Sequence, residues 1–483
     1  HEHGEVVAAT GQQATQPFSL LGVTWTPAAE DTEVEAEVRV RDADGWTDWE
    51  HLHVHEDGPG GDATAGTAPL WVGEADGVEA RVLTSDGAVP RDLQVSLIDP
   101  GTMASDATVA PQASTTAGTT AGTTAAGSVS KPAIITRRGW GADESLRSHC
   151  SNGRFTKTVN VAFVHHTAGS NSYSKSQSKA LVRGIYAYHT RSRGWCDIGY
   201  NFLVDRYGQI FEGRFGGRSG MWQPVYGAHT GGYNNNSVGV SLMGNFETAN
   251  PPTAMMNATA RIVAWKVALN YRDPMGAVRL NGKRFRVISG HRDASATACP
   301  GRNVYSRLPW LRQRTDAMIG TYSSAIYKKW QRLGGRGGFV RAPYWGEHAS
   351  AGGTVARFLG ADLLHTSGPG THEVHGAIRN RYRRLGSENS VLKFPKSDER
   401  SAAAPGALQN IFQRGRIYWS KGTGAHEVYG KILKRYASLG GASGRLRLPT
   451  TGEYTITGGR AQKFQGGQIR WNRSTNTTRV IFN

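Results

Sequence analysis

Three residues in the middle of the chain have side chains that bind transition metals. His165 ends an apolar run at positions 161–164, His291 follows a second apolar run, and Cys299 comes eight residues later. Two imidazoles at strand ends and one thiolate would give zinc three protein ligands and leave a fourth position for water, which is typical of a catalytic site. On residue type and spacing alone, a buried thiol with two core histidines is an equal alternative.

The region that must position these residues, 132–325, alternates strand-like and helical patterns. Short apolar runs predict buried strands, whereas apolar residues three and four apart predict helices. The expected strands are 161–165, 201–204, 209–211, 238–243 and 285–289, and the expected helices include 181–189 and 253–271. These elements predict a mixed α/β domain of ordinary size.

Charge divides the chain into an acidic head and a basic remainder. Residues 1–130 carry 4 basic and 21 acidic side chains, residues 131–325 carry 26 and 9, and residues 326–483 carry 26 and 8. The basic parts would attract polyanions such as nucleic acid, wall polymers or anionic lipid. Because no helix-turn-helix, zinc-finger or RNA-binding signature occurs, we expect an anionic wall polymer and no nucleic-acid partner.

Length and hydropathy place this chain among multidomain proteins outside the membrane. A chain of 483 residues is expected to fold as two to four domains. It has no apolar run of about 18 residues, so no transmembrane segment is expected. Because it starts at His1 without an initiator Met, we expect that a secretion signal has been removed and that the protein is secreted.

The acidic head, residues 1–101, alternates short β-type runs with turn residues, which predicts a small β-sandwich. Its expected strands are 18–25, 33–40, 70–72, 78–82 and 93–98. His51, His53 and His55 alternate on one strand face, but without a cysteine or carboxylate beside them we do not expect a metal site. Residues 102–131 are mostly Ala, Thr, Ser and Gly, which is typical of a flexible linker. The opposite net charges suggest that the head docks on the middle domain.

The tail, residues 326–483, consists of three copies of one repeat. A four-residue motif ending in proline recurs at 340–343, 392–395 and 446–449, and isoleucines at 326, 378 and 432 open the copies. Repeats of this length bury their apolar faces by stacking on their neighbours. Trp419 and Trp471 hold corresponding positions, where they would either offer flat faces to sugar rings or lie in the core.

A series of motifs runs in order from position 138 to position 301. They are Arg138-Gly-Trp-Gly141, Val164-His-His-Thr-Ala168, Gly194-Trp-Cys-Asp-Ile-Gly-Tyr-Asn-Phe202, Phe211-Glu-Gly-Arg214, Gly227-Ala-His229, Val238-Gly-Val-Ser-Leu-Met-Gly-Asn-Phe246, Gly290-His-Arg-Asp293 and Ala298-Cys-Pro-Gly301. Together they resemble the peptidoglycan recognition protein and type-2 N-acetylmuramoyl-L-alanine amidase family. The resemblance implies a hydrolase that cuts the amide between N-acetylmuramic acid and L-alanine in peptidoglycan.

The same resemblance assigns roles to individual residues. It implies that His165, His291 and Cys299 bind zinc and that Tyr200 and Thr297 are catalytic, donating hydrogen bonds to the oxyanion. Family members without the cysteine bind peptidoglycan and do not cut it, so the presence of Cys299 implies an active enzyme. The alternative is a non-catalytic peptidoglycan recognition or wall-adhesion protein.

Four further residues are expected to contact substrate, with a structural role as an equal alternative for each: His229, Asn235, Arg214 and Arg292. Once Cys299 is assigned to the metal, Cys150 and Cys196 remain, and we expect them to form a disulfide. That disulfide would close a loop of 46 residues. Closing it would stabilise the fold by about 3–4 kcal/mol.

The tail repeats resemble LGFP repeats, which occur on secreted wall enzymes of actinobacteria. The glycine of that name is replaced by Arg341, Lys393 and Arg447, so the resemblance rests on the whole repeat. It implies that the repeats hold the protein at the cell wall through an anionic or arabinogalactan-type polymer. The sequence therefore predicts a multidomain, wall-associated protein with a β-sandwich, a mixed α/β zinc amidase domain and three repeats.

Overall fold

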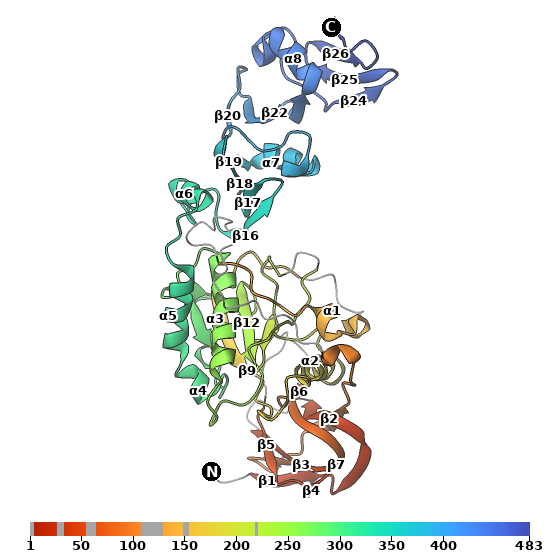
Figure 1. Ribbon diagram of the computed structural model, residues 1–483, viewed down its shortest axis with the longest axis vertical. Helices are drawn as coiled ribbons and strands as arrows, with labels where there is room; N and C mark the ends of the chain where they lie inside the picture. The colour runs from red at the N-terminus through yellow and green to blue at the C-terminus, as the bar shows by residue number, and fades with distance from the viewer. Residues whose placement is uncertain (1–3, 27–32, 55–63, 108–128, 148–153, 218–220) are drawn as a thin grey trace. The chain divides into compact units, whose positions relative to one another are not determined.

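The computed structural model describes residues 4–26, 33–54, 64–107, 129–147, 154–217 and 221–483. They form two compact units, of which the first runs to Gly320 and the second begins at Thr321 (Figure 1). His55 and Cys150, two residues singled out above, lie outside the described residues. None of the helices in the described ranges is long and apolar enough to cross a membrane.

The N-terminal domain is antiparallel β, as expected. Hydrogen bonds join its eight described strands into one sheet, where the expected β-sandwich would have two. The strands are β1 (Glu5–Ala9), β2 (Gln13–Thr26), β3 (Val34–Asp42), β4 (Gly45–Trp46), β5 (Glu50–Leu52), β6 (Ala65–Gly66), β7 (Leu70–Thr84) and β8 (Arg91–Ile98). The long strands β2 and β7 pair with different neighbours along their length. The expected break at 73–77 is wrong: the chain continues as β7, because Ala75 is buried and pairs with Phe18.

A five-stranded sheet in the order β11-β10-β12-β9-β15 forms the centre of the middle domain. Its strands are β9 (Val161–His166), β10 (Phe202–Val204), β11 (Ile210–Glu212), β12 (Ser237–Leu242) and β15 (Ile288–Gly290). All neighbours are parallel except the edge strand β11. The strand expected at 285–289 is divided instead, because Phe285 belongs to a separate hairpin of β13 (Ala277–Leu280) and β14 (Lys283–Arg286).

Helices pack on this sheet and confirm the mixed α/β architecture (Figure 1). They are α1 (Arg137–Trp140), α2 (Ser178–Ala187), α3 (Thr253–Ala268), α4 (Arg302–Tyr305) and α5 (Leu308–Ile319). α2 is buried along its whole length and continues into a π turn at Tyr188–Ser192. An isolated amphipathic helix would leave one face in water, so the burial of α2 means that a second layer covers it.

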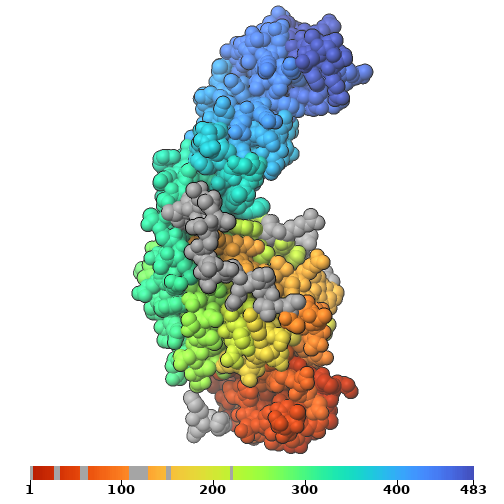
Figure 2. Space-filling view, viewed as in Figure 1, coloured from red at the N-terminus to blue at the C-terminus, as the bar shows by residue number. Residues whose placement is uncertain are grey.

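That second layer is the N-terminal domain, which lies directly against the middle domain (Figure 2). The two domains share an apolar core. Leu20 and Trp71 pack in one cluster with Leu181 of α2. On the N-terminal domain, Gly22 makes room for the ring of Tyr188: a Cβ atom at Gly22 would lie 2.5 Å from Cε2 of that ring. The Tyr188 hydroxyl donates a hydrogen bond to the Thr67 carbonyl at 2.9 Å. The two domains therefore pack through apolar surface rather than through their opposite net charges alone.

Arg183 adds polar contacts to the interface between the N-terminal and middle domains, at the start of the expected linker. The guanidinium of Arg183 in α2 donates to both carboxylate oxygens of Asp106, at 2.9 and 2.7 Å, and to the carbonyls of Pro100 and Gly101. Asp106 ends a short 3-10 helix at Ala104–Asp106. Because both side chains are largely buried, this ion pair is less screened by salt than a surface pair.

The second unit consists of three helix-plus-sheet copies. The helices are α6 (Ala325–Arg332), α7 (Gly376–Arg384) and α8 (Gly430–Ser438). The sheets are β16–β19 (Pro343–Ser350, Gly353–Phe358, Ala361–Thr366, Gly370–His375), β20–β23 (Arg400–Ser401, Leu408–Phe412, Gly415–Ser420, Gly424–Tyr429) and β24–β27 (Tyr454–Ile456, Gly459–Phe464, Gly467–Asn472, Thr478–Phe482). One core joins the first and second sheets through α7, and another joins the second and third through α8. The prediction that the copies bury their apolar faces against each other is confirmed.

The second residue of each four-residue motif has a left-handed backbone. The φ angles are 66° at Arg341, 60° at Lys393 and 55° at Arg447. The carbonyl of each accepts a hydrogen bond from an aromatic side chain of the preceding helix, from Trp330, Tyr382 and Tyr436 respectively. The motif is therefore a turn that ties each helix to its sheet. Trp419 and Trp471 are half-buried and pack against the two cores.

Candidate metal centre

Strand pairing brings the two histidines together. β9 ends in His165 and His166, and Gly290 of β15 pairs in parallel register with Val164, so His291 follows directly beside the end of β9. Because the carboxyl ends of parallel strands lie at the same edge of a sheet, both imidazoles reach one place. Their ring centroids are 4.7 Å apart, and both side chains are buried.

The third donor comes from the loop after His291. The backbone N–H of Arg292 donates to the Cys299 carbonyl at 3.0 Å, which returns the chain to the strand ends. The Arg292 guanidinium donates to the Ala298 carbonyl and forms an ion pair with Glu247 at 3.4 Å. The Thr297 hydroxyl accepts a hydrogen bond from the Cys299 N–H at 3.2 Å. These contacts hold the Cys299 thiol beside the histidines.

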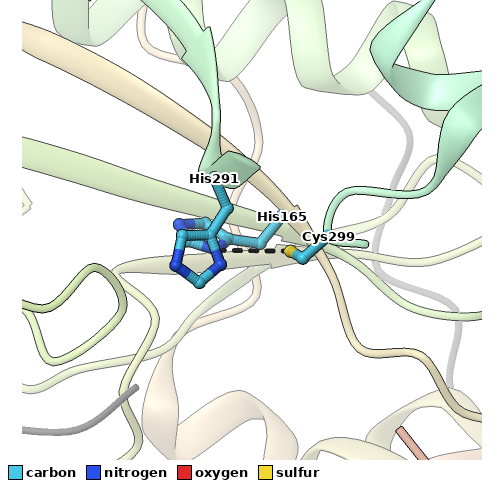
Figure 3. A group of neighbouring side chains, drawn as sticks. All are labelled: His165, His291 and Cys299. Carbon is cyan, nitrogen blue, oxygen red and sulfur yellow. Dashed lines mark hydrogen bonds between the residues drawn. The ribbon is translucent and has the colours of Figure 1, made fainter. Parts of the chain in front are cut away.

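The three side chains converge on a common point (Figure 3). Their candidate ligand atoms all lie within 4.8 Å of one another, and the Cys299 sulfur is 3.6 Å from Nδ1 of His165. Burial lowers the pKa of His291 to about 4, so its ring is neutral and has a lone pair for a metal at neutral pH. Two imidazoles and a thiol are a donor set that fits zinc.

A second layer of polar contacts orients His165 from behind. Its Nε2 lies 3.2 Å from Nδ1 of His229, which is fully buried. The Asn234 side-chain oxygen accepts hydrogen bonds from the N–H groups of His229 and Thr230. In β12, Gly239 leaves space for the imidazole of His229, since a Cβ atom there would lie 2.4 Å from the ring. Fixing the far nitrogen of a metal ligand sets its ring orientation and tautomer.

The predicted catalytic residues lie at this centre. Tyr200 is buried beside it, with its ring centroid 5.5 Å from that of His165. Thr297 lines a pocket of about 280 Å³ that also contains His291 and Cys299. The structure thus brings together all five residues for which metal-binding or catalytic roles were expected.

The four expected substrate contacts lie in different places. His229 contacts His165, whereas Arg292 braces the cysteine loop. Arg214 lines a separate cavity and donates to the Ile198 carbonyl at 3.3 Å. Asn235 is exposed in the turn after His229. Its neighbour Asn234, which holds the His229 backbone, was missed because three consecutive asparagines give no local signal of which one points inward.

The N-terminal domain forms part of the pocket wall, which the sequence did not predict. His51 and His53 of the N-terminal domain line it together with His166, and the centroids of His53 and His166 are 6.4 Å apart. Burial lowers the pKa of His166 to about 3 and also lowers that of His53.

As Cys150 lies outside the described residues, the disulfide with Cys196 stays a prediction.

The sheet that carries the two histidines at its strand ends, and the loop that carries Cys299, lie within the part of the chain that a family comparison matches. The N-acetylmuramoyl-L-alanine amidase family matches residues 155–302. The LGFP repeat family matches residues 342–390, 392–444 and 446–482. A family described as Rv3811 N-terminal galactose-binding domain-like matches residues 2–121.

Individual relatives agree with the family matches. Peptidoglycan recognition protein 1 of Bos indicus is 35% identical over 174 residues, which are 36% of this chain and 80% of that protein. Peptidoglycan-recognition protein SC2 of Drosophila melanogaster is 33% identical over 175 residues, 36% of this chain and 84% of that protein. The solved structure of Drosophila PGRP-LB is 28% identical and covers 36% of this chain and 92% of its own, with a TM-score of 0.30. On the family matches and the identity to the two recognition proteins, the chain belongs to the peptidoglycan recognition protein and type-2 amidase family and carries C-terminal LGFP repeats.

Proposed function

We propose that this protein is a zinc-dependent N-acetylmuramoyl-L-alanine amidase that hydrolyses the amide between N-acetylmuramic acid and L-alanine of peptidoglycan. The observation that carries this proposal is the convergence of His165, His291 and Cys299, whose ligand atoms lie within 4.8 Å of one another beside an accessible pocket. Three protein ligands leave room for a water and a substrate oxygen, as catalytic zinc sites do.

The chemistry divides between the metal and this chain's own residues. His165, His291 and Cys299 would hold the zinc, which would supply Lewis-acid activation of a water molecule at neutral pH. Tyr200, packed beside His165, would donate a hydrogen bond to the carbonyl oxygen as negative charge develops on it. Thr297 lines the pocket beside the metal centre and would donate a second hydrogen bond to that oxygen. His229 keeps the His165 ring oriented during turnover.

The repeats suit a role in holding the enzyme at the wall. Residues 326–483 carry 26 basic and 8 acidic side chains, and LGFP repeats make up nearly all of that region. A strongly basic region attracts anionic wall polymers, including arabinogalactan-type polymers where these carry acidic groups. We therefore propose that the protein works outside the cell, associated with the cell wall.

The decisive experiment is incubation of the full chain with a defined muropeptide, followed by mass spectrometry of new L-alanine amino termini. We expect intact stem peptide to be released, a chelator to abolish the release, and added zinc to restore it. Cys299→Ala should lower the rate by at least about a hundredfold, because it removes a metal ligand.

The matched control is His426→Ala, which removes a histidine of the second repeat whose Nε2 lies 2.8 Å from the nearby Thr423 carbonyl. It should leave the rate unchanged. Tight binding of the muropeptide by the zinc-loaded protein without release of peptide would contradict the amidase and favour a recognition protein.

A further inference from the structure

The pocket beside the metal centre is formed by two domains. From the middle domain come His166, Ala168 and the loop that carries Thr297 and Cys299. The opposite wall comes from the N-terminal domain, with His51 and His53 as its polar side chains. Because both domains share one apolar core, this wall is part of the folded unit.

The N-terminal wall is attached to the middle domain at the pocket itself. Nε2 of His53 lies 3.0 Å from the side-chain amide nitrogen of Asn245, which can only donate. Nε2 is therefore the acceptor, and the proton of the neutral ring is on Nδ1. His51 stands edge-on to His53, with ring centroids 5.9 Å apart, and is itself exposed. Both imidazoles line the pocket, where a bound ligand can contact them.

The composition of the lining selects an uncharged ligand. The described residues around the pocket include histidine, serine and threonine but no lysine, arginine, aspartate or glutamate. At the wall formed by His51 and His53, away from the metal donors, a carboxylate of the stem peptide would lose solvation without gaining a cationic side chain among the lining residues. A sugar ring offers uncharged hydroxyl and N-acetyl groups for imidazoles to hydrogen-bond and a flat face for them to contact.

On the basis of the amidase function proposed above, we propose that His51 and His53 form a glycan subsite, by which the N-terminal domain binds the sugar next to the amide that is cut. The middle domain then supplies the metal centre and the N-terminal domain supplies part of the specificity. The ligand class is an uncharged N-acetylated hexose within a glycan strand.

The test compares two substrates with the same stem peptide, a disaccharide muropeptide and a D-lactoyl peptide that keeps the scissile amide but lacks the sugar. For His51→Ala and His53→Ala we expect KM for the disaccharide substrate to rise about fivefold to tenfold, the loss of one hydrogen bond. We expect kcat to stay within about twofold, and neither constant to change for the lactoyl peptide. The control Asp48→Ala, an exposed side chain of the same domain, should change nothing.

Equal losses on both substrates would show a merely structural role, and unchanged KM values would also overturn the subsite. If the unaltered protein cleaves neither substrate, the amidase fails but the subsite remains testable by calorimetry on the metal-free full chain. There the disaccharide muropeptide should bind more tightly than the lactoyl peptide, and His53→Ala should remove that difference. Equal affinities in the unaltered protein would overturn the subsite independently of catalysis.

Discussion

At the scale of single residues, a variant of Tyr200 allows metal binding and catalysis to be tested separately. Its ring packs beside His165, but it is not among the three donors. Tyr200→Phe keeps the ring and removes the hydroxyl, so zinc content measured by atomic emission should be unchanged. Turnover should fall about a hundredfold, the usual loss for one oxyanion donor. Near-normal turnover would exclude the assigned role, and Tyr207→Phe, which loses a hydroxyl bonded to the Tyr173 carbonyl, is the control.

At the scale of elements, the left-handed residue in each repeat turn is a source of strain. Lys393 has a φ of 60°, which costs a non-glycine residue about 1–2 kcal/mol. Lys393→Gly should relieve that strain at a smaller cost in unfolded-chain entropy, for a net gain of about 0.5–1 kcal/mol. Hydrogen exchange of α7 in the full chain should slow about twofold to fivefold. Lys393→Ala keeps a Cβ atom and should give no gain, whereas equal slowing in both variants would contradict the strain.

At the scale of the whole molecule, one added methyl group can test the contact between the N-terminal and middle domains. Gly22→Ala would place a Cβ atom within 2.5 Å of the Tyr188 ring, so the interface should lose about 1–3 kcal/mol. Hydrogen exchange in α2 should accelerate by roughly tenfold, while the repeats stay unaffected. Gly368→Ala, where a new Cβ meets nothing within 4 Å, is the matched control. Unchanged exchange in α2 would mean that the domains do not depend on this contact.

The sequence identified the donors but not their surroundings, for physical reasons. His165 and His291 could be placed at strand ends because apolar runs precede them, and family motifs supported Tyr200 and Cys299. The pairing of β15 with β9 joins segments more than 120 positions apart, so local patterns do not predict it. The N-terminal wall was missed because His53 meets Asn245 through a long-range contact, and its strand shows only alternation.

The Arg183–Asp106 ion pair has a consequence for how the chain tolerates cleavage. It fastens the last described residues of the N-terminal domain to α2, just before the Ala- and Thr-rich segment at 108–128. A protease that cut within that segment would break the covalent connection, but the shared core around Leu20 and Trp71 would remain. The nicked protein would therefore persist as a two-fragment complex, separating on a denaturing gel while eluting as one species from a sizing column.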